Sequence, residues 1–381
     1  MPGPLHGVKV IELAGLGPAP FAAMLLADMG ADVVTVERAG MVTGAPLESA
    51  KGMVYGRGRR SIGVDLKHPD GVGVVLDLCA DADVCIEGFR PGVVERLGVG
   101  PDVVRARNER LVYGRMTGWG QDGPYADRAG HDINYIAVAG PLAHIGRAGA
   151  PPTPPLNLLG DFGGGGLLLA FGIVSALVER ATSGLGQVVD AAMVDGAAIL
   201  SAPIAPAFAL GFFHAERGTN WLDSGAPYYD VYECADGRWL SIGAIEPQFY
   251  ANLLAGLGLD PAVLPAQDDE SAWPELKERF AAIVRTRTAD EWMAVFDDPN
   301  NCVAPVRSFA EVLDDPHLAA RGTYVDVDGV PQPAPAPRFD RTPATLDRPP
   351  APAGHHTDEV LAEAGVDAAT IAALRASGAV A

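Results

Sequence analysis

The first half of the chain alternates short apolar runs with longer amphipathic segments. The apolar runs predict strands at residues 8–14, 32–37, 61–65, 83–86, 111–116 and 187–192. The segments between them predict helices at 21–29, 68–79, 167–180 and 193–200, and a further helix that begins at Val93. Strands that alternate with helices are typical of a parallel sheet covered on both faces. The pattern therefore predicts a doubly wound, Rossmann-like α/β domain.

The pattern changes near Thr219. Two strands are predicted at 226–233 and 238–244, and Asp236-Gly237 between them is a strong hairpin-turn signal. Helical stretches follow to about Leu318, and a proline-rich run at 331–337 precedes two more helical segments, 357–365 and 367–377. We therefore expect a smaller α+β domain at 221–325, and a large domain formed by 1–220 with 326–381.

Two segments are unusually apolar. The predicted helix 167–180 is apolar on nearly every side but too short to span a bilayer, so we expect it to be buried. The stretch 197–213 is broken by Pro203 and Pro206, which favours a buried or dimer-facing segment over a membrane span. The first apolar run lacks a basic leader, and we expect a cytoplasmic protein.

The composition is that of a soluble protein with a large core: 48% of the 381 residues are hydrophobic and 20% are charged. The net charge of −20 argues against nucleic acid or an anionic membrane as the main partner. The four cysteines, Cys79, Cys85, Cys234 and Cys302, form no CxxC pair and no zinc-ligand spacing. We expect free thiols in a reducing compartment and no metal site.

A local cluster of positive charge stands out in this acidic chain. Between residues 38 and 67 it contains Arg38, Lys51, Arg57, Arg59, Arg60 and Lys67, against Glu48 and Asp65. The cluster follows a predicted strand end, where α/β proteins tend to bind ligands, so a phosphate site competes with an ordinary solvated loop.

The loop after the first strand resembles a dinucleotide fingerprint. Gly15 and Gly17 fit the motif, and Glu37 lies about 20 residues further on. Pro20 stands where a Gly or Ala should allow close packing of helix and strand, which disfavours a dinucleotide site.

Residues 130–166 carry the residues best suited to chemistry. The segment opens with Gly130, His131 and Asp132, and closes with Asp161 and four glycines before the apolar helix. A helix N-terminus with bare backbone can bind an anion, and an acid with a histidine can transfer protons. The alternative is an ordinary helix-capping aspartate beside loop glycines.

Several further motifs together carry a resemblance to a known family. They are Gly7 to Leu13, Ala31 to Arg38, Ile86 to Gly92, Thr117 to Gln121 and Val188 to Met193. With these, the chain resembles the family III CoA-transferases and, within them, the α-methylacyl-CoA racemase branch. The branch is indicated by His131 in the first stretch and Asp161 in the second, since the transferases keep the aspartate but usually lack the histidine.

The resemblance implies a large and a small domain, and two chains interlocked as a homodimer with the active site at the subunit interface. It also implies a 1,1-proton transfer at Cα of a 2-methylacyl-CoA thioester. His131 and Asp161 would act on opposite faces of the enolate, and Glu246 would orient His131, with Tyr229 nearby. The N–H groups from Gly160 to Gly164 would stabilise the enolate, assisted by Asn157 or Asn134.

The resemblance also implies where CoA binds, as part of the substrate and with no separate cofactor. The expected contacts are Arg38, Val64, Asp65, Leu66, Lys67, Gly88, Phe89, Arg90, Pro91, Gly92 and Arg96. Gly130, Asp132 and Tyr135 are expected as neighbours of the reacting group.

Three alternatives remain open on the sequence, and one of them is a hydratase or another relative that handles acyl-CoA. A CoA-transferase would use Asp161 as a nucleophile, and a non-catalytic protein would bind acyl-CoA without exchanging the Cα proton. The sequence leaves the acyl chain undefined.

Overall fold

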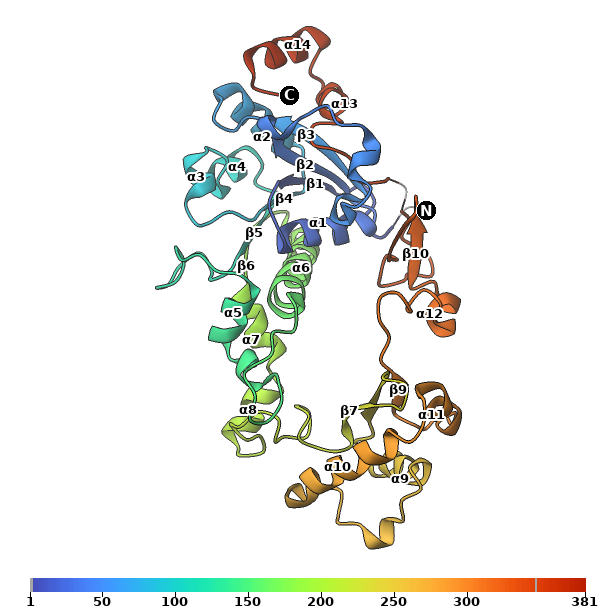
Figure 1. The fold of residues 1–381 in the computed structure, drawn as a ribbon. Helices are drawn as coiled ribbons and strands as arrows, with labels where there is room; N and C mark the ends of the chain where they lie inside the picture. Colours follow the sequence, from blue (N-terminus) through green and yellow to red (C-terminus); the bar gives the residue numbers. More distant parts are fainter. Residues whose placement is uncertain (1–2, 347) are drawn as a thin grey trace. The chain divides into compact units, whose positions relative to one another are not determined.

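The computed structural model describes residues 3–346 and 348–381. One of its sheets has six strands in the order β3-β2-β1-β4-β5-β6 (Figure 1). The strands are β1 (Lys9–Leu13), β2 (Asp32–Arg38), β3 (Arg59–Val64), β4 (Val84–Glu87), β5 (Val112–Thr117) and β6 (Val188–Ala192). Every neighbouring pair is parallel, which confirms the predicted doubly wound fold. The strand order reverses between β1 and β4, the position where such sheets usually bind ligands.

Helices cover both faces of this sheet. Strand side chains alternate, so Val10 faces one core and Ile11 the other. Helices α1 (Pro18–Asp28) and α6 (Leu167–Ser183) pack on the Val10 side. The Ile11 side carries α2 (Pro69–Ala80), α4 (Pro101–Arg107), α13 (Thr357–Glu363) and α14 (Ala368–Ser377). This two-sided burial explains why the strands appear as continuous apolar runs.

The N-terminal helix begins three residues earlier than predicted. Pro18 is its first residue, where proline is favoured because its missing N–H needs no helical partner. Gly17 precedes it with φ of 69°, a conformation that favours glycine. The turn between β1 and α1 is therefore tight, and it lies at the carboxyl edge of the sheet.

The chain divides into two compact units. The first consists of residues 1–139, 156–200 and 321–381, and the second of 140–155 and 201–320. These boundaries differ from the predicted domain limits by up to about 20 residues, and they place the 140–155 loop with the second unit.

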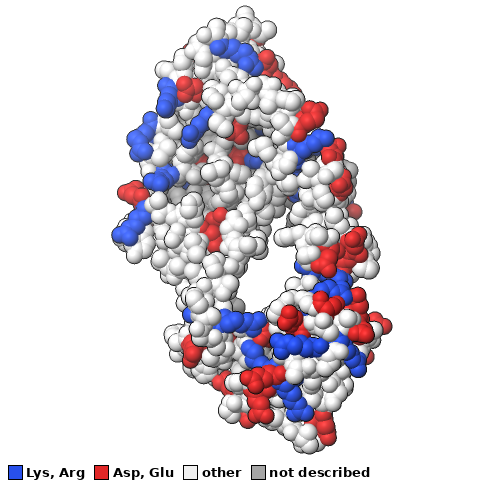
Figure 2. Space-filling model, viewed as in Figure 1, with Lys and Arg blue, Asp and Glu red and all other residues white. Residues whose placement is uncertain are grey.

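The second unit has its own sheet and core. Its antiparallel sheet contains β7 (Tyr229–Glu233), β8 (Trp239–Gly243) and β9 (Val303–Pro305). The predicted hairpin is present, with Gly237 at φ of 76° in the turn. The helices are α8 (Ile204–Ala209), α9 (Pro247–Gly256), α10 (Trp273–Val284) and α11 (Ala289–Val295), with α12 (Pro316–Arg321) at its end. Figure 2 shows positive and negative side chains interspersed over its visible face.

A two-stranded ribbon near the C-terminus was not predicted. It pairs β10 (Tyr324–Val327) with β11 (Val330–Pro333), so it includes part of the proline-rich run. The Arg57 guanidinium donates to Gln332 Oε1 at 2.8 Å and to the Pro333 carbonyl at 2.7 Å. These bonds fasten the ribbon to the segment between β2 and β3 of the same unit. Prolines are tolerated in the ribbon because it has only two strands, each of which is an edge strand.

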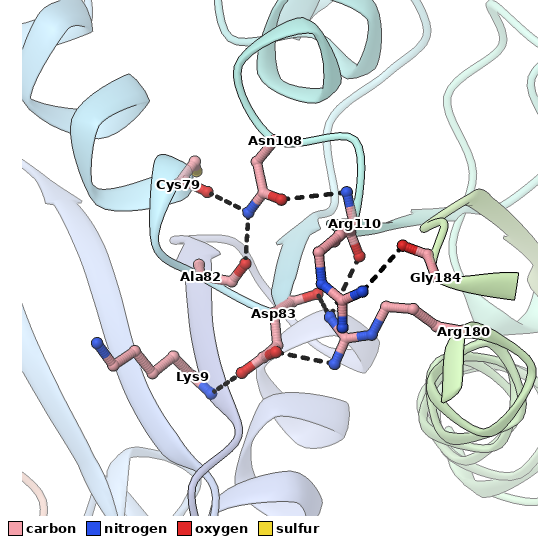
Figure 3. A network of polar contacts seen from close by, with 8 residues as sticks. All are labelled: Lys9, Cys79, Ala82, Asp83, Asn108, Arg110, Arg180 and Gly184. Atoms are coloured by element: carbon pink, nitrogen blue, oxygen red, sulfur yellow. Dashed lines mark hydrogen bonds and ion pairs between the residues drawn. The ribbon is translucent and has the colours of Figure 1, made fainter. Parts of the chain in front are cut away.

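The amino edge of the sheet is closed by a polar network around Asp83 (Figure 3). The Asp83 carboxylate accepts from the Lys9 backbone N–H and from Arg180, each at 2.8 Å. Arg180 comes from the last turn of α6 and also donates to the Arg110 carbonyl. The network ties α6 to the starts of β1 and β4, at the edge opposite the loop that contains Gly17.

Helix α6 is only half buried, which corrects the expectation that it lies inside the protein. Its inner face reaches the core, whereas Leu167, Phe171 and Val178 are 55%, 69% and 68% exposed on the other face. The preceding residues join α6 in one apolar segment, Leu158–Ser183, which is long enough to cross a membrane by length and composition alone. Its burial against the sheet favours a core helix of a folded protein with one uncovered face.

The apolar stretch 197–213 also remains largely exposed in the single chain. Ile199, Leu210 and Phe212 are exposed, and Phe213 is buried. The expectation of burial within one chain is therefore wrong for most of this stretch. Its alternative, that the stretch faces a second subunit, stays a prediction.

Candidate active site

His131 lies at the start of a short helix, α5 (Asp132–Ala139). Its carbonyl accepts from the Asn134 N–H at 2.8 Å, and its own N–H donates to Asn134 Oδ1 at 3.0 Å. Asn134 therefore fixes the backbone at this helix start, and the histidine side chain is exposed to solvent. The predicted role of Asn134 in stabilising an enolate is separate from this backbone contact and stays a prediction.

Asp161 lies within a helix, whereas the sequence placed it just before one. Residues Leu158–Gly166 form a π-helix that runs directly into α6. Such wide turns are rare and are frequently found at functional sites. The Asn157 side chain donates to Asp161 Oδ2 at 3.1 Å. A Cβ built on Gly17 would lie 3.6 Å from the same oxygen, so the carboxylate faces the loop after β1.

Asp132 connects these two elements. Its carboxylate Oδ2 accepts from the backbone N–H groups of Gly160 at 2.5 Å and of Asp161 at 2.8 Å. Both N–H groups belong to the first turn of the π-helix, where an intrahelical acceptor is lacking. The prediction that these two groups bind an enolate is therefore wrong for the structure as it stands, because Asp132 already occupies them.

The run of four glycines allows neighbouring helices to pack closely. A Cβ on Gly164 would lie 2.8 Å from the Ala197 N atom, and one on Gly166 would lie 2.5 Å from the Pro18 carbonyl oxygen. Ala197 belongs to α7 (Met193–Leu200) and Pro18 to α1. Three of the four glycines are buried because neighbouring helices press against their backbone.

The environment raises the pKa of Asp161. Burial of the carboxyl is the main cause, and the charge of Asp132 adds to it. The hydrogen bond from Asn157 and the nearby His131 act in the opposite direction without cancelling the rise. Burial therefore has the largest effect among these four causes. The lowering effect of His131 on the pKa of Asp161 indicates that the two residues lie in the same region, and their action as a pair of bases stays a prediction.

Aromatic residues surround Asp161. Burial and the Asp161 charge raise the pKa values of both Tyr55 and Tyr135. Tyr135 donates its hydroxyl to the Gly130 carbonyl and packs edge-on against Trp119 at 4.8 Å between ring centroids. A Cβ on Gly130 would lie 2.7 Å from the Tyr135 ring, which explains the glycine before His131.

Tyr55 is a neighbour that the sequence reading missed. It belongs to a 3-10 turn, Val54–Gly56, and its ring lies 5.9 Å from that of Phe162 and 6.3 Å from that of Phe21. It comes from the irregular segment between β2 and β3, and no periodicity or motif in that segment marks it. Only the folding of this segment toward the π-helix reveals the contact.

The predicted CoA contacts lie at the carboxyl edge of the sheet. Arg38 ends β2 and pairs in register with Val64, the last residue of β3. Arg38, Lys67, Arg90 and Arg96 are exposed. Val64 is buried and bridges to Val380, and Asp65 and Leu66 are half-buried, so Lys67 is the exposed side chain of that segment.

The loop Gly88 to Gly92 follows β4 and adjoins the candidate bases. The Arg90 charge lowers the pKa of Tyr135 against the larger effect of burial, which places it near that ring. Glu87 accepts from the Phe89 N–H at 2.7 Å and holds the loop start. Gly92 has φ of 77°, and a Cβ there would lie 3.2 Å from the Arg96 guanidinium. Pro91 is half-buried between them.

Half of the basic cluster seen in the sequence is unavailable to a ligand. Arg57 pairs with Asp28 at 2.6 Å, Arg59 pairs with Glu12, and Arg60 bonds to Asp32 at 2.7 Å. All three arginines are buried, so they are structural ion pairs. Arg38, Lys51 and Lys67 keep exposed side chains in this part of the chain.

The remaining predicted residues, Glu246 and Tyr229, belong to the second unit. Glu246 precedes α9 at its N-cap position, and Tyr229 is the first residue of β7. Their place beside His131 stays a prediction.

The first unit also contains a cavity of about 1030 Å³, lined by parts of β1, β2, α2, α13 and α14. None of the predicted site residues lines it. The chemistry described above therefore belongs to the carboxyl edge of the sheet and not to this cavity.

Comparison with known proteins agrees with this geometry. The family model described as CoA-transferase family III matches residues 5–357. An alpha-methylacyl-CoA racemase from Mus musculus is 48% identical over 363 residues, covering 95% of this chain and 93% of that protein. An alpha-methylacyl-CoA racemase from Homo sapiens is 45% identical over 371 residues, with the same two coverages.

The fold has a solved counterpart as well. The crystal structure of a CAIB/BAIF family protein from Brucella suis matches with a TM-score of 0.83 and 28% identity, over 96% of this chain and 100% of that one. With a family model that spans nearly its whole length and relatives of this similarity, the chain belongs to CoA-transferase family III.

Proposed function

We propose that this protein is an α-methylacyl-CoA racemase, which interconverts the R and S forms of 2-methylacyl-CoA thioesters by a 1,1-proton transfer. The observation that carries the proposal is that Asp132 joins the helix that follows His131 to the π-helix that carries Asp161, at the carboxyl edge of the sheet. The relatives that are 48% and 45% identical bear this enzyme name and support the assignment.

The reaction needs one base on each face of a planar enolate. One group removes the Cα proton, the other donates a proton to the opposite face, and the reverse reaction exchanges their roles. Such a pair works best when the two pKa values lie close together and near the working pH. Burial raises the pKa of Asp161 and so brings the carboxyl closer to the range of an imidazole.

The enolate also needs hydrogen-bond donors, because a Cα proton beside a thioester is a very weak acid. The N–H groups of Gly160 and Asp161 are occupied. We assign the role instead to the N–H groups of Asp132 and Ile133 at the start of α5, because the Asn134 N–H already donates to the His131 carbonyl. The first N–H groups of a helix lack intrahelical acceptors and point toward a developing negative charge.

The CoA part of the substrate is assigned to the exposed cations at the sheet edge, Arg38, Lys67, Arg90 and Arg96, together with the loop Gly88 to Gly92. The protein would need no metal or organic cofactor. Glu246 is proposed to orient the imidazole of His131 and to keep one tautomer.

A homodimer with the active site at the subunit interface fits the uncovered apolar faces. The outer side of α6 and the stretch 197–213 expose large apolar side chains that a second subunit would cover. We propose a cytoplasmic location.

Proton exchange in D₂O tests the function. The purified protein is incubated with one epimer of a 2-methylacyl-CoA, and Cα deuterium is followed by NMR alongside loss of optical purity. Exchange with epimerisation in the wild type, and no epimerisation in His131→Ala or Asp161→Ala, is the expected result. Near-normal epimerisation in either variant would eliminate the two-base scheme.

A CoA-transferase is the second candidate. The observation that favours it is the position of the Asp161 carboxylate, which faces the loop after β1 and has the Asn157 amide at 3.1 Å. This arrangement also suits a carboxylate that attacks a thioester carbonyl and forms an acyl anhydride. Transfer of CoA to an added carboxylic acid, without Cα exchange, would establish this activity in place of racemisation.

A further inference from the structure

We propose that Asp132 is a positioning residue for proton transfer, whose carboxylate fastens the helical turn that carries Asp161 to the helix that follows His131. The inference rests on the proposed function, since it assumes that His131 and Asp161 are the two bases.

The placement of Asp132 is unusual for an aspartate. It is the first residue of α5, yet it is only 3% exposed. Its Oδ2 atom accepts two backbone hydrogen bonds from the π-helix, and its Oδ1 atom is buried without a partner among the described residues. A buried carboxylate is costly unless its hydrogen bonds compensate. The two bonds to the π-helix are therefore the main interactions that keep this charge inside.

The sequence around the contact fits it tightly. A Cβ on Gly160 would lie 2.7 Å from Asp132 Oδ2, closer than real side chains approach. Only glycine at position 160 allows the carboxylate to reach both N–H groups. The buried carboxylate of Asp132 on α5 thus depends on the N–H groups of the π-helix as donors, and those N–H groups depend on the carboxylate as their acceptor.

The contact couples the two bases because of chain connectivity. His131 and Asp132 share a peptide bond, and the Asp161 N–H is one of the two groups bound. One carboxylate therefore sets the backbone of His131 against that of Asp161. A shift of about 1 Å between reacting groups can lower a rate roughly 100-fold, so this distance matters for inversion.

Asp132 also sets the charge around Asp161. The groups that face the Asp161 carboxylate are His131, Asp132 and Tyr135 from α5, Tyr55 from the turn 54–56, and the neutral Asn157. Arg90 lies beyond Tyr135. Asp132 is the one carboxylate in this set apart from Asp161 itself, and its charge raises the pKa of Asp161. Removal of that charge should lower the pKa.

Two variants separate the effect of the backbone hydrogen bonds of Asp132 from the effect of its charge. Asp132→Asn keeps an oxygen that can accept the backbone N–H groups but removes the charge, and Asp132→Ala removes both. Hydrogen–deuterium exchange of the peptide that contains Gly160 and Asp161 should be faster in Asp132→Ala and nearly unchanged in Asp132→Asn. Equal protection in wild type and Asp132→Ala would overturn the proposal, whether or not either protein is active.

The second measurement isolates Asp161. In a His131→Ala background the remaining base can still exchange the Cα proton of one epimer with solvent, without inversion. The exchange rate should fall as the pH is lowered and Asp161 becomes protonated. When Asp132→Asn is added, this fall (the acidic limb of the pH profile) should occur at a lower pH. Asp77→Asn, an exposed change on α2, is the matched control and should leave the limb in place. An unmoved limb in the Asp132→Asn protein would refute the electrostatic part.

A third comparison covers catalysis in the otherwise wild-type enzyme. Racemisation should fall about 100-fold in Asp132→Ala and much less in Asp132→Asn. Equal losses in the two variants would contradict a role through the backbone bonds. If wild-type protein fails to exchange any 2-methylacyl-CoA, the proposed function fails, while the hydrogen–deuterium result still decides whether Asp132 holds the turn.

Discussion

Substituting Gly196 by alanine should damage both the stability and the activity of the protein. Gly196 lies in the middle of α7, where an added Cβ would be 1.8 Å from the Gly164 carbonyl oxygen and 2.5 Å from the Gly164 carbonyl carbon and Cα. Ordinary contact begins at 3.4 Å, so α7 and the π-helix would have to separate by roughly 1.6 Å. All three atoms are backbone, which cannot rotate away as a side chain could.

The size of the effect follows from this geometry. Overpacking of a core usually costs about 1–3 kcal/mol, and we expect a value near the upper end because backbone meets backbone. The displaced π-helix carries Asp161, so a shift of this size should also reduce racemisation by about 100-fold. The urea midpoint reports the first effect, and the rate of Cα epimerisation reports the second.

Gly73→Ala is the matched control, because it makes the same chemical change in another helix. Gly73 lies within α2, and a Cβ there meets nothing within 4 Å. Alanine should stabilise that helix by about 0.5–1 kcal/mol and leave activity unchanged. If Gly196→Ala behaved like Gly73→Ala in both assays, the close packing of α7 on the π-helix would be refuted.

Three further outcomes are expected. Arg38→Ala should raise KM for the acyl-CoA more than it lowers kcat, because the residue is proposed to contact the CoA end alone, and an unchanged KM would remove it from the site. Arg57→Ala should cost about 3–5 kcal/mol in unfolding free energy because it leaves Asp28 buried and unpaired, whereas Arg107→Ala breaks an exposed pair and should change the urea midpoint little. For the epimer whose Cα proton Asp161 removes, the kcat/KM profile should fall on its acidic side at a higher pH than the ordinary aspartate value of 3.8, because burial raises the pKa of Asp161 and only its ionised form accepts a proton. A fall at or below pH 3.8 for that epimer would contradict this environment.

The sequence by itself determined the architecture of the first unit. Strands buried on both faces appear as continuous apolar runs, and their alternation with helices admits little besides a parallel doubly wound sheet. The same local signals located the Asp236-Gly237 hairpin and the helix 193–200. His131 and Asp161 were identified as candidate bases because their surrounding motifs match those of a family, and their action as a pair stays a prediction.

The tertiary structure decided what each charged or glycine residue does. Arg57, Arg59 and Arg60 resembled a phosphate site in the sequence, but the fold uses them in buried ion pairs. The glycine run resembled an anion cradle, and the fold places α7 against the backbone of Gly164 and α1 against that of Gly166, too closely for a side chain at either position. Local pattern carries no information on which distant segment will pack against a residue.

The same limit explains the Asp132 contact and the missed Tyr55. Asp132 and Gly160 lie 28 residues apart, and no spacing rule predicts that the carboxylate of one would bind the backbone of the other. Tyr55 comes from an irregular segment whose course depends on the sheet beneath it. Sequence periodicity determines which faces are apolar. The distances and electric fields that set the pKa of Asp161 arise only when α5, the π-helix and the turn 54–56 come together in the fold.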